Sequence, residues 1–160
     1  MSERTIGAKV TITKPGRYTL ASDIQNGGGT HLSEACIRIE ADDVVLDGRG
    51  FTLAGRGVSD TTGIVAADVQ NVTIHNLTVS GWDYGIRFEN VRGGVVRNAR
   101  LVDTGYGISF VNTESVRVRD SHIVQNVLGV MMDAPSNVSL EDNRFESNAG
   151  RDVYRVARRG

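Results

Sequence analysis

The chain has 160 residues, a formal charge of −1 and 6% aromatic side chains. This length favours one domain with a mainly aliphatic core, and the near-neutral charge gives no reason to expect nucleic acid or a membrane surface as a partner. The single cysteine excludes an intrachain disulfide, and no apolar run reaches the length of a membrane span.

The N-terminal part of the chain predicts a short β-structured cap. Residues 8–24 contain two alternating apolar and polar runs on either side of Pro15 and Gly16. A Pro-Gly pair is typical of a turn, so each run is predicted to be a strand. We interpret residues 1–35 as an N-terminal cap that ends in a glycine-rich loop at 25–35.

Residues 36–62 contain an irregular copy of the pattern that follows them. Alternating apolar residues again predict strands. The segment is longer than the later copies, and we expect the additional residues to enlarge a turn at 48–50 and a loop at 54–62. Cys36 stands at the start of this segment, where a small residue fits, and we expect a packed thiol rather than a reactive one.

Four consecutive windows of 22 residues follow, and each begins with glycine: Gly63, Gly85, Gly107 and Gly129. A fixed period of this length indicates a solenoid. Each window contains three short alternating runs, so we predict an all-β parallel β-helix of about five to six coils, with its coils at 36–150. The initial glycines suggest either a bend with positive φ or close approach of neighbouring backbones.

Stacking of the coils places equivalent residues about 4.8 Å apart, in columns. The interior column of the first strand is predicted to be Ile64, Ile86, Ile108 and Val130. A second column occupies a turn, and its amide and carboxyl side chains are predicted to form a hydrogen-bonded ladder. This column consists of Asn76, Asn98, Asp120 and Asp142.

The C-terminal residues 151–160 are predicted to form a partial coil or a tail. An end strand without a neighbour invites pairing with another chain. We therefore expect self-association through this end, with a head-to-head dimer as the specific hypothesis.

The repeats resemble the coils of the pectin lyase-like superfamily. The resemblance rests on the GI-x-F opening at 85–88, on NVTIHNLTV at 71–79, on VVLDGRGFTL at 44–53 and on the turn column. In addition, KPGRYTL at 14–20 is similar to the N-terminal segment of secreted or periplasmic members. It implies a right-handed, single-stranded β-helix and an extracellular or periplasmic location, although this chain has no signal-peptide pattern. The superfamily contains lyases, hydrolases, epimerases, tailspikes and non-enzymatic surface proteins, so no single activity is implied.

The resemblance also implies where a sugar would bind, namely on the outside of the first strand of each coil. The polar candidates on that face are Arg87, Glu89, Ser109 and Asp133. Calcium takes 6–8 oxygen ligands, and this face has only two carboxylates, about 9.6 Å apart. A calcium-dependent lyase is therefore not supported, and this separation is the outer limit for an inverting hydrolase. No cofactor and no metal site is expected.

Arginines line the outside of the second strand. Arg97, Arg117 and Arg119 lie on neighbouring coils, and like charges at that spacing repel unless they are paired or bind anions. The cluster is consistent with a track for an anionic polysaccharide, but we favour the other interpretation, a solvated face neutralised by nearby carboxylates.

Three aromatic residues gather near one corner of the coils. Tyr84 and Tyr106 share a column and are predicted to pack on each other. Trp82 is the better candidate for an exposed aromatic platform under a sugar ring.

Three functional interpretations remain open. The preferred one is a non-catalytic surface or scaffold module with acidic carbohydrate as its candidate ligand, because the expected binding face lacks a carboxylate cluster. The alternatives are a small polysaccharide lyase or hydrolase and an engineered or truncated β-helix without activity of its own.

Overall fold

The computed structural model describes residues 3–25, 34–57 and 61–156. In this part of the chain, every regular element is a strand. The strands are β1 (Glu3–Ile6), β2 (Val10–Ile12), β3 (Gly16–Leu20), β4 (Ala35–Ile39), β5 (Val44–Asp47), β6 (Thr52–Ala54), β7 (Thr62–Ala67), β8 (Gln70–Ser80), β9 (Tyr84–Glu89), β10 (Arg92–Val102), β11 (Tyr106–Val111), β12 (Glu114–Arg119), β13 (His122–Val124), β14 (Leu128–Met132), β15 (Asn137–Glu141), β16 (Arg144–Glu146) and β17 (Arg151–Arg155).

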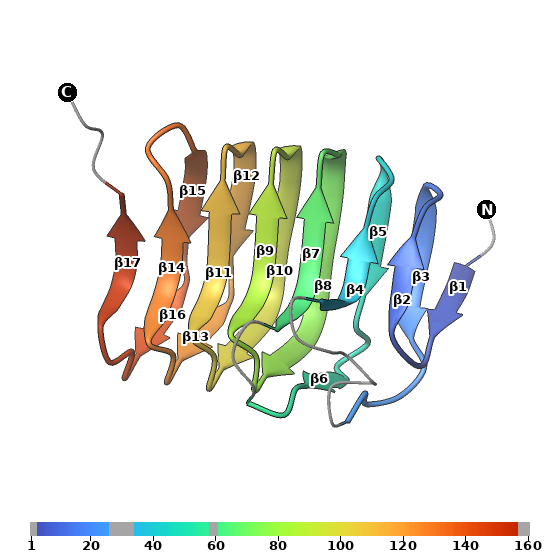
Figure 1. Cartoon of the computed structure of the whole chain (residues 1–160), viewed down its shortest axis with the longest axis horizontal. Coiled ribbons are helices and arrows are strands. Elements are labelled where there is room, and N and C mark those ends of the chain that lie inside the picture. Colours follow the sequence, from blue (N-terminus) through green and yellow to red (C-terminus); the bar gives the residue numbers. More distant parts are fainter. Residues whose placement is uncertain (1–2, 26–33, 58–60, 157–160) are drawn as a thin grey trace.

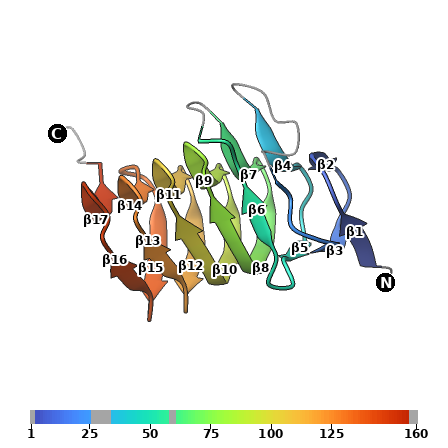
Figure 2. The same ribbon diagram turned by 90° about the horizontal axis from the view of Figure 1, so that it is seen from below.

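The strands form two parallel sheets that run the length of the molecule (Figure 1). The first strands of the coils make one sheet in the order β17-β14-β11-β9-β7-β4-β2, and the second strands make the other in the order β1-β3-β5-β8-β10-β12-β15. The third strands of successive coils are, in order, β6, the last part of β8, the last part of β10, β13 and β16 (Figure 2). Within the described residues, about five coils therefore stack between β4 and β16, which confirms the predicted solenoid.

The predicted interior column is also confirmed. Ile64 pairs in register with Ile86, Ile86 with Ile108, and Ile108 with Val130. All four side chains are fully buried, and burying each contributes roughly 1.5–3 kcal/mol. Because a coil alone cannot enclose its own apolar side chains, this contribution exists only in the stack.

The glycines that open the coils are explained by close backbone approach rather than by positive φ. A Cβ on Gly85 would lie 2.6 Å from the carbonyl oxygen of Gly107, and one on Gly107 would lie 2.5 Å from that of Gly129. Any side chain at these positions would push neighbouring coils apart.

Positive φ occurs instead at the bend between the second and third strands. The φ angles are 58° at Asn76, 48° at Asn98, 51° at Asp120 and 53° at Asp142. Asn and Asp tolerate this left-handed conformation better than most residues. We call these four residues the bend column.

The bend column does not contain the ladder of hydrogen bonds between coils that the sequence suggested. Among the described residues, its one side-chain hydrogen bond to another coil runs from Asn76 Nδ2 to Asp47 Oδ1, at 3.3 Å. A ladder occurs at the preceding turn: Asn90 Nδ2 donates to Asp68 Oδ1 at 2.9 Å, and Asn112 Nδ2 donates to Asn90 Oδ1 at 2.7 Å.

The N-terminal strands extend both sheets. On either side of Pro15, β2 pairs in parallel with β4 and β3 pairs in parallel with β5. Their inward side chains are covered, with exposed fractions of 4% for Ile6, 2% for Ile12 and 0% for Leu20. The predicted loop at 25–35 lies mostly outside the described residues, and its last residue, Ala35, begins β4.

The long first coil, β4–β6, contains the predicted turn after β5. Arg49 and Gly50 have φ angles of 54° and 81°, and the Phe51 N–H donates to the carbonyl of Gly48. The other enlargement, predicted at 54–62, lies partly outside the described residues. Cys36 is fully buried, as expected for a packed thiol.

The last strand, β17, continues the first sheet by pairing in parallel with β14. The rest of the predicted C-terminal segment, 157–160, lies outside the described residues. The described part of the chain holds no helix with the length and apolar character of a membrane span.

Candidate functional site

A groove of about 790 Å³ follows the bend between the second and third strands along several coils. The bend column lines it together with a second column, two residues later in each coil: Thr78, Arg100, His122 and Arg144. Between the two columns lie the buried side chains of Leu77, Ala99 and Ser121. We call this feature the bend groove.

The left-handed residue at each bend explains why the groove is polar on both sides. In a regular strand, side chains alternate between the two faces, so the inward Val72 and Ile74 would be followed by inward side chains at 76 and 78. The positive φ of Asn76 reverses this order. Residues 76 and 78 therefore line the groove, while Leu77 between them is only 3% exposed.

Asp47 closes the N-terminal end of the bend groove. Its carboxylate accepts hydrogen bonds from Arg17 Nη2 at 2.8 Å, from the Arg49 amide at 2.9 Å and from Asn76 Nδ2. Burial alone would raise the pKa of this carboxyl, but the hydrogen bonds from Arg49 and Asn76 and the neighbouring positive charges outweigh burial and lower the pKa below its ordinary value. Asp47 is therefore ionised and already satisfied by protein groups.

His75 lies beside Asp47 in the neighbouring coil and is 5% exposed. Its Nε2 is 4.0 Å from Asp47 Oδ2, and neither ring nitrogen has a hydrogen-bond partner among the described residues. Burial and the adjacent Arg97 lower the pKa of the imidazole, although Asp47 opposes this shift. His75 is therefore neutral at neutral pH.

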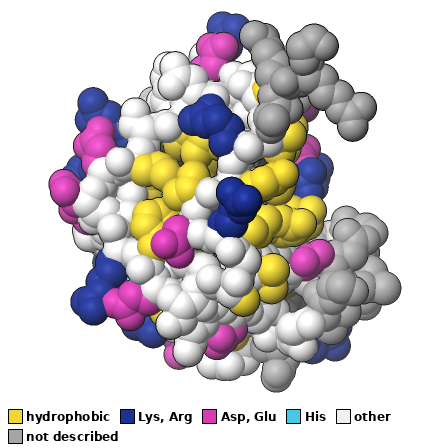
Figure 3. Space-filling view, turned by 90° about the vertical axis from the view of Figure 1, so that its left-hand side faces the viewer, with side chains coloured by type: hydrophobic (Ala, Val, Ile, Leu, Met, Phe, Trp, Pro, Cys, Tyr) yellow, Lys and Arg dark blue, Asp and Glu magenta, His cyan; other side chains and the backbone are white. Residues whose placement is uncertain are grey.

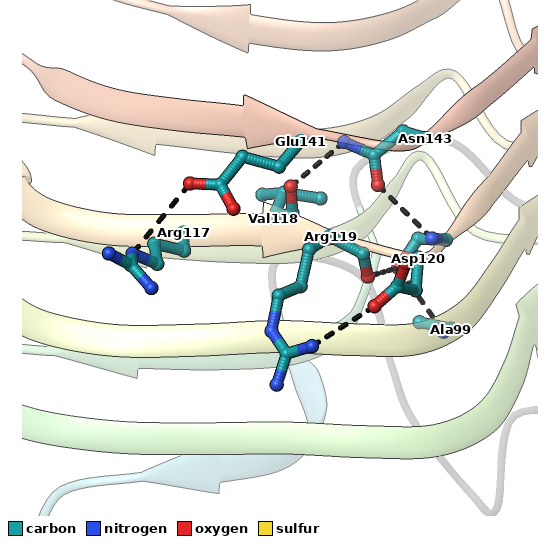
Figure 4. A network of polar contacts seen from close by, with 8 residues as sticks. Ala99, Arg117, Val118, Arg119, Asp120, Glu141 and Asn143 are labelled. Carbon is teal, nitrogen blue, oxygen red and sulfur yellow. Dashed lines mark hydrogen bonds and ion pairs between the residues drawn. The ribbon is translucent and has the colours of Figure 1, made fainter.

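Two of the predicted arginines of the second strand, Arg117 and Arg119, have carboxylate partners (Figure 4). Arg117 lies 3.8 Å from a carboxylate oxygen of Glu141, and Arg119 donates to Asp120 at 3.0 Å. The side chain of Arg97 makes no hydrogen bond or ion pair with any described residue. Two of the three guanidiniums are thus neutralised in the way that the solvated-face interpretation requires.

Four groups of the bend groove have no hydrogen bond or ion pair from their side chains within the described residues: Thr78, Asn98, Arg100 and Asp142. The remaining charges are engaged, since Arg49 contacts Glu3 and Arg144 contacts Glu146. A hydroxyl, an amide, a guanidinium and a carboxylate are therefore available together to a ligand.

The face of the first strand is less open than the resemblance implied. Arg87 forms an ion pair with Glu89 at 2.5 Å, and its guanidinium lies 4.7 Å from the centre of the Tyr84 ring. Both side chains line a shallow hollow of about 200 Å³. Their charges are used within the protein.

Ser109 and Asp133 are also unsuited to an open binding face. Ser109 is fully buried. Asp133 accepts hydrogen bonds from the Asn112 amide at 3.1 and 3.0 Å and from Ser136 Oγ at 2.5 Å. Asp133 therefore stabilises the turn that follows β14.

The aromatic corner differs from the prediction at one residue. Trp82 is 3% exposed and donates from Nε1 to the Leu53 carbonyl at 3.1 Å, so the expectation of an exposed platform is wrong. Tyr84 and Tyr106 stack with ring centres 4.7 Å apart and an interplanar angle of 15°, which confirms their predicted packing.

No group of three or more His, Cys, Asp or Glu side chains is arranged to hold a metal ion among the residues described. A second hollow of about 370 Å³ lies at the preceding turn and includes Asp42 and Asp68. Asp42 accepts a hydrogen bond from the Gln70 amide, and Asp68 accepts one from Asn90. These carboxylates connect neighbouring coils.

Comparison with known proteins agrees with this architecture. The chain is similar in structure to a putative glycosyl hydrolase from Parabacteroides merdae, with a TM-score of 0.60, 14% sequence identity, and coverage of 89% of this chain and 77% of that one. At this identity the similarity concerns the fold. No curated protein matches the chain significantly. The family model for the right handed beta helix region matches residues 62–158, more than half of the chain. The chain therefore belongs to the right-handed β-helix family.

Proposed function

We propose that this protein is a non-catalytic carbohydrate-binding module and that an extended acidic sugar chain lies along its bend groove. The observation that carries the proposal is the set of four unpaired polar groups in a groove that crosses several coils. A linear polymer parallel to the stack would meet a new row of side chains about every 4.8 Å.

The chemistry of the four groups suits such a ligand. Arg100 presents a planar set of donors that matches a carboxylate or sulfate, and its charge is not neutralised by a protein partner. Asp142 accepts hydrogen bonds from hydroxyls, while Asn98 and Thr78 both donate and accept. Acidic sugars carry both kinds of group.

A glycoside hydrolase is the second candidate function. Asp120 and Asp142 occupy one column on consecutive coils, about 4.8 Å apart, and retaining glycosidases place their carboxyl groups at about 5–5.5 Å. Asp120 is engaged by the guanidinium of Arg119, whereas Asp142 has no side-chain partner among the described residues. We prefer binding because the unpaired groups along the groove are of four different kinds and only one of them is a carboxylate.

The test is titration calorimetry with uronate oligomers and with neutral oligomers of equal length, at low salt. Loss of a charge-assisted contact costs about 1.5–3 kcal/mol, so Arg100→Gln should weaken uronate binding about 10- to 100-fold. The control is Arg92→Gln, which removes an exposed arginine from the other end of β10. Equal weakening by both variants, or no binding to any acidic oligomer, would contradict the proposal.

Release of reducing ends from the same oligomers would identify the hydrolase instead. In that case Asp142→Asn should abolish product formation while binding persists. An absence of product from every oligomer bound by the wild type supports a non-catalytic module.

A further inference from the structure

The C-terminal end of the stack exposes apolar side chains. Among the described residues, the large hydrophobic side chains with high exposed fractions are Val127 (59%), Val153 (38%), Val156 (38%) and Tyr154 (36%). Val153, Tyr154 and Val156 lie in or directly after β17, the last strand of the stack, whereas Val127 lies in the turn before β14, where the Gly150 amide of the next coil donates a hydrogen bond to its carbonyl. Figure 3 views this end, with hydrophobic side chains at its centre and charged ones around and upon them.

The geometry of the solenoid explains this exposure. The first sheet ends at β17 and the second at β15, so one edge of each strand has no neighbour among the described residues. The interior column of Ile108 and Val130 continues into Val153, which has a coil on one side only. In β15 and β16, Leu140 and Phe145 are likewise only partly buried.

The opposite end of the stack is closed. Ile6, Ile12 and Ile24 are 4%, 2% and 3% exposed. In the part of the N-terminal end that the structure describes there is no comparable apolar surface, so on a second copy of the chain the matching surface is the same C-terminal end. A contact between identical surfaces is two-fold and closes after two copies.

We propose that the C-terminal coils of two copies meet end to end and form a symmetric dimer. The inference does not depend on sugar binding. The charges of the last coil permit this contact, because the net charge of residues 137–155 is only −1. This segment contains four acidic residues and three arginines: Glu141, Asp142, Glu146 and Asp152, and Arg144, Arg151 and Arg155. Neither sign dominates enough for two such ends to repel strongly.

One feature makes the dimer reversible. Arg155 pairs in register with Met132 and donates from Nη1 to the Ser136 carbonyl, so a charge stands at the end of an interior column. Charged residues of this kind limit uncontrolled pairing of edge strands. We therefore expect a dimer that dissociates measurably at micromolar concentrations rather than a permanent one.

Sedimentation velocity of the wild-type protein over a wide concentration range tests the proposal. A concentration-dependent dimer that never grows larger is expected. Val153→Lys places a charge at the centre of the contact and should raise the dissociation constant at least tenfold. Circular dichroism would show whether the fold persists, and Val156→Lys gives a second variant at the same end.

The matched control is Thr11→Lys, which puts the same charge on an exposed residue of the edge strand β2 at the N-terminal end. It should leave the dimer intact. A monomer at every concentration would overturn the proposal. Growth into longer assemblies, or loss of association in Thr11→Lys, would overturn it in favour of head-to-tail stacking.

Discussion

Adding one methyl group to the glycine column should destabilise the protein, although alanine is normally the better residue in a regular strand. In Gly107→Ala the new Cβ would lie 2.5 Å from the carbonyl oxygen of Gly129, and 3.2 Å from both Asn126 Nδ2 and Ile123 Cγ2. An ordinary contact with that oxygen is at least 3.4 Å, so the two backbones must separate by several tenths of an ångström. The atoms that must move are backbone atoms of the parallel pair β11 and β14.

The expected cost follows from two opposing terms. Overpacking in a well-ordered interior costs typically about 1–3 kcal/mol, while Gly→Ala at an unstrained site contributes about 0.4–1 kcal/mol through the unfolded chain. The first term should dominate, with a net loss of about 1–2 kcal/mol in the free energy of unfolding. With a urea m-value of about 1–3 kcal/mol/M, the midpoint should fall by roughly 0.5–1 M.

Urea unfolding followed by circular dichroism measures this loss. The control is Gly7→Ala, because a Cβ there would meet no atom within 4 Å. That variant should be as stable as the wild type or slightly more so. If Gly107→Ala unfolded at the same urea concentration as Gly7→Ala, close approach of the coils would not be the reason for the glycine.

Three further predictions concern the column and ladder residues. Ile108→Ala, at a fully buried position, should lower the free energy of unfolding by about 2–5 kcal/mol; a urea midpoint equal to that of the wild type would contradict the continuous interior column. Asn90→Ala removes one hydrogen bond to Asp68 and one from Asn112 at a residue with φ of 55°, and should lower the free energy of unfolding by about 1–3 kcal/mol. Asn71→Ala removes a single bond to Asp43, so thermal unfolding should show a smaller loss of stability for this variant. His75 has a pKa below its ordinary 6.5 in the folded protein, so the unfolded chain takes up the proton first and stability should fall as the pH drops below 6.5. His75→Gln should flatten that dependence between pH 5 and 7 in denaturation experiments, and an unchanged slope would show that His75 is not its source.

The period of the sequence predicted the fold because stacking acts on every coil alike. Equivalent positions at 22-residue spacing must share one environment, so Ile64, Ile86 and Ile108 identify both the strand and its inward face. The ladder was assigned to the wrong turn, although Asp68, Asn90 and Asn112 stand at the same spacing. Spacing identifies a column but not the direction of its side chains.

The bend groove and the burial of Trp82 could not be read from alternation. One left-handed residue at Asn76 interrupts the alternation of β8, so the strand pattern alone does not show that Asn76 and Thr78 line one groove. A Cβ on Gly55 would lie 2.8 Å from Trp82, so the loop of the enlarged first coil lies directly against the indole. This contact depends on an irregular segment that no repeat describes.

The uniform register between coils also makes the 22-residue window a unit of growth. Each coil contacts only the coils before and after it, and β9 and β11 pair in the same register as β11 and β14. Duplicating residues 85–106 would therefore lengthen the protein by one coil, about 4.8 Å, without creating any type of junction that the chain does not already contain. Changes in the length of such a protein should thus occur in whole windows, and a gain or loss of a single residue should be tolerated only in the turns.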